Sequence, residues 1–349
     1  MRLIRPLYVI RLLALLLVPS VGVPVVAAEP AARKTTTQVR DKKPTYSASK
    51  SRARKARLAR ARAAARAREQ ARIRALREAM TPRYKTDATG ALVPDVRAAA
   101  AIIFSPETGQ VLWEENGQSK RSIASITKVM TAVVFLEDTP DLSDEITIQR
   151  SDVYAASTTY LRANDRITLD QLLRLTLIAS DNAAARALAR VSHDGTASFV
   201  ERMNEKAIEL GLESTTFADP SGLNPANISS AYDLSRLITF ASQDERLSPI
   251  MRTAEYTVRT HRRSIKIRNT NHLVRAGQID VLGGKTGFIT KAGYCLATLL
   301  RLPQSNHQVA VVVLGAASNN GRFWETRHLF DWLSAKTADI FTQEQGQVH

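Results

Sequence analysis

The sequence of 349 residues contains one cysteine, Cys295, and six histidines that lie far apart. One thiol cannot form an internal disulfide, and its position in an apolar run predicts a buried strand residue. The histidines never show the His-Glu-x-x-His spacing of a zinc protease helix. We therefore expect an enzyme or binding protein that uses neither a metal nor another cofactor.

Long apolar runs are also scarce. The one that occurs lies at the N-terminus. Residues 7–18 are apolar apart from Arg11, two arginines precede them, and small residues follow up to Ala28. This order is typical of a secretory signal peptide, so we expect cleavage after residues 1–28 and export to the periplasm or cell envelope. An uncleaved membrane anchor is the alternative, although a spanning helix needs about 20 apolar residues.

Acidic residues are scarce in one segment, residues 33–85, which holds 19 Lys/Arg and 3 Asp/Glu. This basic segment accounts for the formal net charge of +16, because the chain from residue 86 onward holds 27 basic and 29 acidic residues. Alanine and arginine dominate residues 52–80 and favour helix, but like charges at helical spacing repel each other. We predict a low-complexity linker over residues 29–93 that is disordered or a fluctuating helix.

The basic segment has two interpretations. It could attract an anionic membrane or wall surface, since clustered positive charge binds such surfaces without a folded site. It could equally be a spacer that only improves solubility. Nucleic acid is not expected as a partner because the protein is expected to be exported.

Apolar runs and turn residues predict one folded domain over residues 94–341 and a short tail over residues 342–349. Strands are expected at both ends of this domain and helices in its middle. Expected strands cover 98–104, 110–114, 256–260, 264–267, 280–285, 294–300 and 308–314, and expected helices cover 128–137, 169–178, 183–191, 199–210, 232–241 and 323–341. Short links between the last strands imply antiparallel pairing. We predict an α/β fold in which an antiparallel sheet is built from both ends of the domain and flanked by helices, with a mostly helical lobe.

The first motif with chemical potential is Ser125-Ile126-Thr127-Lys128. Ser125 and Lys128 are three residues apart at the start of a predicted helix, so their side chains share one face. A serine hydroxyl needs a base to become a nucleophile. A lysine can be that base if burial, or a neighbouring cation such as Lys285, lowers its pKa.

The second motif, Ser180-Asp181-Asn182, stands between two predicted helices. The ordinary interpretation is a helix N-cap, which these residue types favour. On the functional interpretation, Ser180 relays a proton between Lys128 and the leaving amine. Asn182 then donates a hydrogen bond to the substrate backbone.

The third motif, Lys285-Thr286-Gly287, is expected to close an apolar strand. A plain β-turn is the ordinary interpretation. Alternatively, Lys285 and Thr286 bind a carboxylate through charge and hydroxyl, and Gly287 leaves room beside the nucleophile. Each motif is weak alone, but the three in this order form the signature of class A β-lactamases and penicillin-binding proteins.

The three motifs and the stretch Asp219-Pro220-Ser221-Gly222-Leu223-Asn224 resemble the low-molecular-mass penicillin-binding proteins, and most of all the D-alanyl-D-alanine endopeptidases. The resemblance implies a serine β-lactamase/transpeptidase-like fold, peptidoglycan stem peptides as substrates and β-lactams as covalent inhibitors. The site residues that it implies are Ser125 as acylated nucleophile, Lys128 as general base, Ser180 and Asn182 as further site residues, Lys285 and Thr286 for a carboxylate, Gly287, and the backbone N–H groups of Ser125 and Phe288 as oxyanion hole.

Two other functions compete with a DD-peptidase. A serine β-lactamase shares the acylation step but, in class A, needs a deacylating glutamate in a Glu-x-x-Leu-Asn setting, which is absent between Asn182 and Lys285. A non-catalytic wall-binding protein would not need all the motif side chains. The sequence leaves open whether a terminal D-alanine or a D-alanyl cross-link is cleaved.

Overall fold

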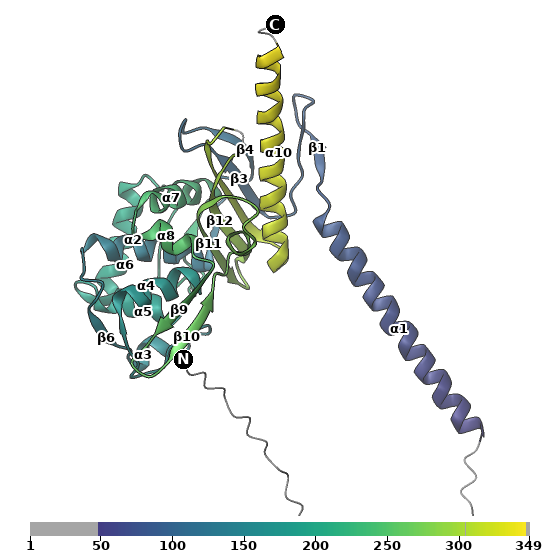
Figure 1. Ribbon diagram of the computed structural model, residues 1–349, viewed down its shortest axis with the longest axis horizontal. Helices are drawn as coiled ribbons and strands as arrows, with labels where there is room; N and C mark the ends of the chain where they lie inside the picture. Colours follow the sequence, from purple (N-terminus) through teal and green to yellow (C-terminus); the bar gives the residue numbers. More distant parts are fainter. Residues whose placement is uncertain (1–47, 304, 347–349) are drawn as a thin grey trace, which may run out of the picture. The chain divides into compact units, whose positions relative to one another are not determined.

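The structure is a computed structural model that describes residues 48–303 and 305–346 (Figure 1). The predicted signal peptide, residues 1–28, lies outside these ranges. In the described ranges, no helix combines the length and the apolar character that crossing a bilayer requires. Contacts divide the chain into a first unit that ends at Ala65 and a second unit that begins at Arg66.

Helix α1 (Ala48–Met80) contains the alanine–arginine stretch of the basic segment. Of the two predicted states for this stretch, helix and disorder, the structure has the helix. Almost all of its described side chains are exposed to solvent. Its basic residues lie on all sides of the helix, because their spacing follows no period of three or four residues.

A five-stranded antiparallel sheet with the strand order β11-β12-β13-β3-β4 forms the centre of the second unit (Figure 1). Strands β3 (Ala100–Phe104) and β4 (Val111–Glu115) come from the start of the fold. Strands β11 (Val281–Ile289), β12 (Gly293–Arg301) and β13 (Gln308–Ala316) come from its end. Because β3 pairs with β13, the prediction of one sheet built from both ends is confirmed.

The two faces of this sheet are buried by different helices. Along β13, Val311 and Val313 belong to the apolar core on the side of α10 (Asn319–Gly346). Val312 lies between them and belongs to the core on the side of α7 (Ala231–Gln243). Burial on both faces explains why the strand is a continuous apolar run rather than an alternating one.

The predicted helical lobe is confirmed. Its longer helices start and end within four residues of the predicted limits, namely α2 (Thr127–Glu137), α4 (Leu169–Ile178), α5 (Asn182–Val191) and α6 (Gly195–Glu209). The predicted second hairpin is also present, as β9 (Glu255–Arg259) paired with β10 (Ser264–Arg268). The remaining short elements are η1 (Ala124–Ile126), α3 (Arg150–Val153), α8 (Leu247–Arg252), α9 (His272–Ala276), β5 (Arg121–Ser122), β6 (Glu145–Thr147), β7 (Arg166–Thr168) and β8 (Ile228–Ser229).

The structure moves both predicted limits of the folded domain. Strand β1 (Tyr84–Thr86) pairs with β2 (Leu92–Pro94), so the predicted boundary at residue 94 falls inside a hairpin. Val93 is buried in the core beneath α10, which ties this hairpin to the domain. At the other end, α10 continues to Gly346, so most of the predicted tail is helical.

The third motif is not at the end of its strand. β11 continues to Ile289, and Lys285 and Gly287 pair with Ala297 and Cys295 of β12. The plain β-turn interpretation is therefore wrong. The strand extends past the motif because β12 offers backbone partners there, which the β11 sequence alone does not reveal.

Candidate active site

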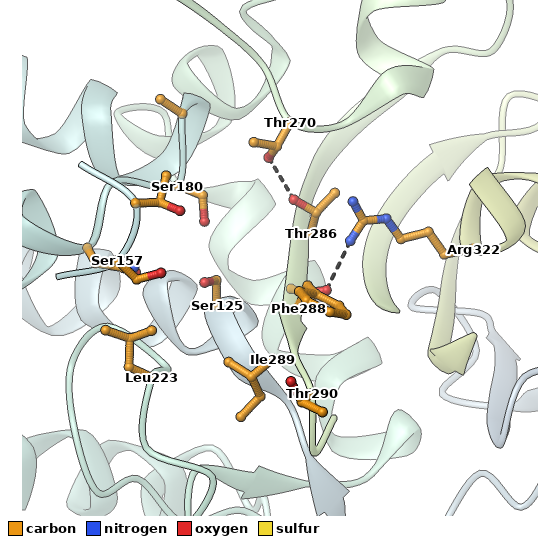
Figure 2. A pocket seen from close by; sticks show the side chains of 14 residues that line it. Ser125, Ser157, Ser180, Leu223, Thr270, Thr286, Phe288, Ile289, Thr290 and Arg322 are labelled. Carbon is orange, nitrogen blue, oxygen red and sulfur yellow. Dashed lines mark hydrogen bonds between the residues drawn. The ribbon is translucent and has the colours of Figure 1, made fainter. Parts of the chain in front are cut away.

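Ser125 lies in η1, directly before α2, where three backbone segments meet (Figure 2). Two glycines permit this contact. A Cβ atom on Gly222 would lie 2.1 Å from the carbonyl oxygen of Ala124, and one on Gly287 would lie 2.6 Å from that of Ile123. The loop 219–224 and strand β11 can therefore reach the main chain that carries Ser125 only without side chains at these positions.

Lys128 is fully buried on the first turn of α2, as the apolar helix sequence predicted. Its Nζ lies 3.1 Å from Ser125 Oγ and donates to Asn182 Oδ1 at 2.6 Å and to the carbonyl oxygen of Ser221. Burial lowers the pKa of Lys128 to about 7, although the carboxylates of Asp219 and Asp181 oppose this shift. At neutral pH a substantial fraction of this amine is thus unprotonated and able to accept the hydroxyl proton of Ser125.

The N-cap interpretation of the second motif is confirmed, and the two residues beside the cap lie at the pocket. Asp181 caps α5, because its Oδ1 accepts a hydrogen bond from the backbone N–H of Ala184 at 2.9 Å. Ser180 has a left-handed φ of 60° and lines the pocket, and Asn182 faces Lys128. The N-cap residue therefore orients the two residues beside it toward the site.

Lys285 is almost completely buried in the middle of β11. Its Nζ donates to Ser180 Oγ at 2.8 Å and to the carbonyl oxygen of Thr286 at 2.9 Å. Burial, together with the positive charges of Lys128 and Arg322, holds the pKa of Lys285 well below its usual value. Of the two predicted causes of a lowered pKa of Lys128, burial is the larger, and the cation that adds to it is Arg186 rather than Lys285.

A pocket of about 430 Å³ opens above these side chains. In Figure 2, the hydroxyl groups of Ser125, Ser157 and Ser180 point toward it from one side, and Thr286 and Phe288 border it from the other. The complete lining is Ser125, Ser157, Thr158, Ala179, Ser180, Asn182, Leu223, Thr270, Thr286, Gly287, Phe288, Ile289, Thr290 and Arg322. The predicted site residues all line this pocket, apart from the two lysines directly beneath it.

Some pocket residues have no predicted role. Arg322 of α10 donates from Nη1 to the carbonyl oxygens of Gly287 at 2.9 Å and Cys295 at 3.1 Å. Burial lowers the pKa of Arg322 to about 10, so the guanidinium stays charged at neutral pH. Thr270 accepts from Thr286 Oγ1 at 2.6 Å. Arg322 is a single residue in an amphipathic helix and Thr270 a single residue in a loop, so no sequence motif predicts that either lines the pocket.

From the sequence, the loop 219–224 has no predicted role beyond a family resemblance. In the structure, the loop lies against Lys128. Asp219 accepts hydrogen bonds from the backbone N–H groups of Ser221 at 3.2 Å and Gly222 at 3.0 Å. It also accepts from Nδ2 of Asn227. These contacts hold the carbonyl oxygen of Ser221 against Lys128.

Residues 87–318 match the family described as Peptidase_S11, D-alanyl-D-alanine carboxypeptidase. The chain belongs to this family. The D-alanyl-D-alanine endopeptidase of Escherichia coli K12 is 33% identical over 250 residues, which are 70% of this chain and 80% of that protein. A D-alanyl-D-alanine carboxypeptidase of Bacillus subtilis is 30% identical over 67% of this chain and 61% of its own length.

Solved structures agree with this family. The Streptomyces K15 DD-transpeptidase superposes with a TM-score of 0.63 at 28% identity, over 68% of this chain and 97% of its own. A putative penicillin-binding protein homologue from Mycobacterium tuberculosis gives a TM-score of 0.65 at 26% identity, over 72% and 96%. The transpeptidase-like fold is confirmed, and the family assignment makes this chain a serine DD-peptidase of peptidoglycan.

Proposed function

We propose that Ser125 is the acylated nucleophile of this peptidase and Lys128 its general base. The contact that carries the proposal is the 3.1 Å separation between Lys128 Nζ and Ser125 Oγ, with the lysine fully buried. Ser125 Oγ attacks the carbonyl carbon of a D-alanyl residue while its proton passes to the unprotonated amine of Lys128. The backbone N–H groups of Ser125 and Phe288 stabilise the oxyanion.

The second proton transfer involves Ser180. When the tetrahedral intermediate collapses, the leaving amine takes a proton through the Ser180 hydroxyl and the acyl group remains on Ser125. Ser180 Oγ accepts a hydrogen bond from Lys285 rather than from Lys128, so Lys285 is the amine that supports this relay. The proton that Lys128 took from Ser125 then passes to Lys285, so Lys128 is unprotonated again when it acts as base for the water that hydrolyses the acyl-enzyme.

The remaining pocket side chains bind the substrate. The amide of Asn182 and the edge of β11 hold its backbone on opposite sides of Ser125. Lys285 and Thr286 bind its carboxylate, and the charged guanidinium of Arg322 adds positive potential at the same end of the pocket. A β-lactam, which also carries a carboxylate beside a reactive carbonyl, fits the same groups.

Within this reaction we propose cleavage of D-alanyl cross-links rather than trimming of terminal D-alanine. The chain covers 77–80% of the three relatives named endopeptidases. Its coverage of the relatives named carboxypeptidases ranges from 61% to 79%, and their identity of 28–32% is below the 33–34% of the endopeptidases. Incubation with purified cross-linked muropeptide dimers and with monomers tests this, and release of D-alanine from monomers with intact dimers would overturn it.

We also propose that residues 1–28 direct export to the periplasm and that α1 binds an anionic surface there. The helix holds 12 Lys/Arg and 2 Asp/Glu and exposes them on all sides. A helix without an apolar face does not insert into a bilayer, so its attraction is electrostatic.

Acylation by a fluorescent penicillin tests the proposed site. We expect the intact protein to carry one penicillin adduct on the peptide that contains Ser125, detected by mass spectrometry. Ser125→Ala should carry none while its melting temperature stays close to that of the wild type. An adduct that persists in this variant would refute the assignment.

A further inference from the structure

The loop between α3 and β7, residues 154–165, forms one wall of the pocket through Ser157 and Thr158. It also holds Asn182. The carbonyl oxygen of Ala156 accepts from Asn182 Nδ2 at 2.7 Å, and that of Thr158 accepts from the backbone N–H of Asn182 at 3.0 Å. The position of this α3–β7 loop therefore decides which way the Asn182 amide points.

Two charged side chains form hydrogen bonds with the backbone of one loop residue, Tyr160. The backbone N–H of Tyr160 donates to Asp181 Oδ2 at 2.6 Å, and its carbonyl oxygen accepts from Arg263 Nη2 at 2.6 Å. Asp181 belongs to the second motif, whereas Arg263 comes from the turn between β9 and β10, 103 residues after Tyr160. The loop is thus clamped at Tyr160 between the catalytic lobe and a remote hairpin.

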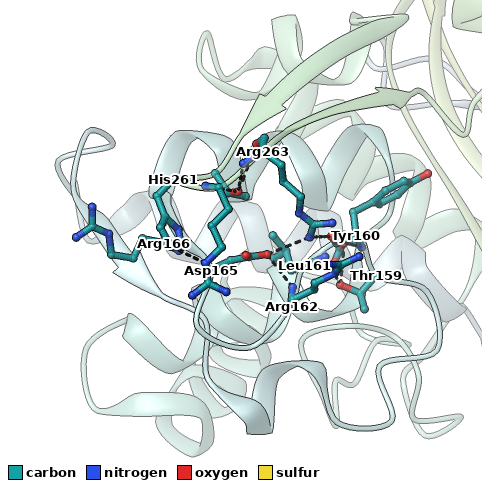
Figure 3. Close-up of polar contacts among 11 residues, drawn as sticks. Thr159, Tyr160, Leu161, Arg162, Asp165, Arg166, His261 and Arg263 are labelled. Atoms are coloured by element: carbon teal, nitrogen blue, oxygen red, sulfur yellow. Dashed lines mark hydrogen bonds and ion pairs between the residues drawn. The ribbon is translucent and has the colours of Figure 1, made fainter.

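Arg263 holds a second point of the same loop (Figure 3). Its Nη2 lies 3.1 Å from Oδ2 of Asp165, a carboxylate with only 1% of its side chain exposed. Oδ2 also accepts from the backbone N–H of Arg162 at 2.9 Å. In the described part of the chain, Arg263 is the one cation within ion-pair distance of Asp165.

The backbone of the α3–β7 loop is strained, and the contacts with Asp181 and Arg263 hold it in this conformation. Ala155, Ser157 and Asn164 all have left-handed φ angles, between 49° and 66°. Such conformations are unfavourable for residues such as Ala155 and Ser157, less so for asparagine, and persist where surrounding contacts enforce them. Without Arg263, the loop would lose two contacts: the hydrogen bond to the carbonyl oxygen of Tyr160 and the ion pair with Asp165.

We propose that Arg263 is a positioning residue for the peptidase reaction. It fixes the α3–β7 loop and, through the carbonyl oxygens of Ala156 and Thr158, it fixes the amide of Asn182 against Lys128. The inference rests on the proposed function, because it assigns Arg263 an effect on the acylation of Ser125. It makes the β9–β10 hairpin part of the machinery that prepares the pocket for substrate.

The test compares penicillin acylation in Arg263→Ala and in the wild-type protein. We expect the first-order acylation rate constant at saturating penicillin to fall about tenfold, since small misplacements of reacting groups have effects of this size or larger. Arg263→Lys keeps the charge and one donor nitrogen, and it should recover part of the rate. A residue with only a structural role would lower the melting temperature without changing the saturated rate.

Arg262 supplies the matched control. It lies in the same turn, is exposed, and donates from Nε only to Nε2 of its neighbour His261 at 2.9 Å. Arg262→Ala should acylate at the wild-type rate. If Arg263→Ala does not fold because Asp165 is left without its cation, the double variant Arg263→Ala/Asp165→Asn removes that charge and serves as the test.

The outcomes separate the two proposals. A wild-type protein that is not acylated at Ser125 refutes the proposed function. A wild-type protein that is acylated, with a folded Arg263 variant that reaches the same saturated rate, overturns only the role of Arg263. Equal losses in the Arg262 and Arg263 variants would overturn it as well, since Arg263 and not Arg262 contacts Tyr160 and Asp165.

Discussion

The amine of Lys128 and the side-chain amide of Asn182 are joined by a hydrogen bond of 2.6 Å between Nζ and Oδ1. Because Nδ2 of the same amide donates to the carbonyl oxygen of Ala156, the amide oxygen must face the lysine. In the unprotonated amine, Asn182 and the carbonyl oxygen of Ser221 accept the two protons, so the lone pair is free to face Ser125 Oγ. This contact joins two motifs that are 54 residues apart.

The acylation rate should depend on pH through Lys128. Burial sets the pKa of Lys128 at about 7, and only the unprotonated amine accepts the Ser125 proton. The rate of penicillin acylation should therefore rise with pH through a midpoint near 7 and fall about tenfold per unit below it. Stopped-flow measurements with a fluorescent penicillin check this, and a rate that does not change between about pH 5 and pH 8 would contradict it.

Asn182→Asp should move this pH profile upward. A carboxylate next to the buried amine favours the charged lysine, so the pKa of Lys128 should rise by about one unit or more. The midpoint of the acylation profile should shift by the same amount. Asn182→Ala is the control, because it removes the amide without adding charge and should slow acylation without an upward shift of the midpoint.

Gly222→Ala should destabilise the fold and disturb Ser125. Its Cβ would clash with the carbonyl oxygen of Ala124 at 2.1 Å, and its φ of 81° disfavours any side chain. We expect a loss of about 2 kcal/mol or more in the free energy of unfolding, measured with urea.

Gly277→Ala separates the two causes of that loss. Gly277 has a φ of 62° but nothing within 4 Å of an added Cβ. Gly277→Ala should lower the free energy of unfolding by only about 1 kcal/mol, because only the backbone conformation disfavours the side chain. Equal losses for the two variants would mean that contact with Ala124 contributes nothing.

Cys295 should be inert in the native protein. The side chain is fully buried in β12, and burial raises the pKa of its thiol to about 11. Because the thiolate is the reactive form, iodoacetamide should modify Cys295 at neutral pH only after unfolding. Mass spectrometry of native and urea-treated protein checks this, and rapid modification of the native protein would contradict the buried position.

Binding through α1 should depend on salt. Exposed charges act through a screened potential whose range falls to about 8 Å at physiological ionic strength. Cosedimentation with isolated peptidoglycan sacculi should weaken as salt is raised, and a variant with the α1 arginines changed to glutamine should bind less at low salt. Equal binding by both proteins at every salt concentration would leave α1 as a spacer.

The sequence by itself determined the local features of this protein. Continuous apolar runs predicted the core strands β3, β12 and β13, because a strand buried on both faces has no polar side. Helical periodicity predicted α4 over the same residues as observed. The three motifs predicted residues at the pocket because each has a recognisable spacing in the sequence.

Only the tertiary structure decided how distant residues meet. The extension of β11 past Lys285 depends on its pairing with β12, and the burial that lowers the pKa of Lys128 involves contacts with α5 and the loop 219–224. Arg322 and Arg263 enter the site region from a helix and a hairpin whose sequences carry no motif. Such contacts are long-range, so no local pattern encodes them, and they exist only once the sheet and the helical lobe have packed together.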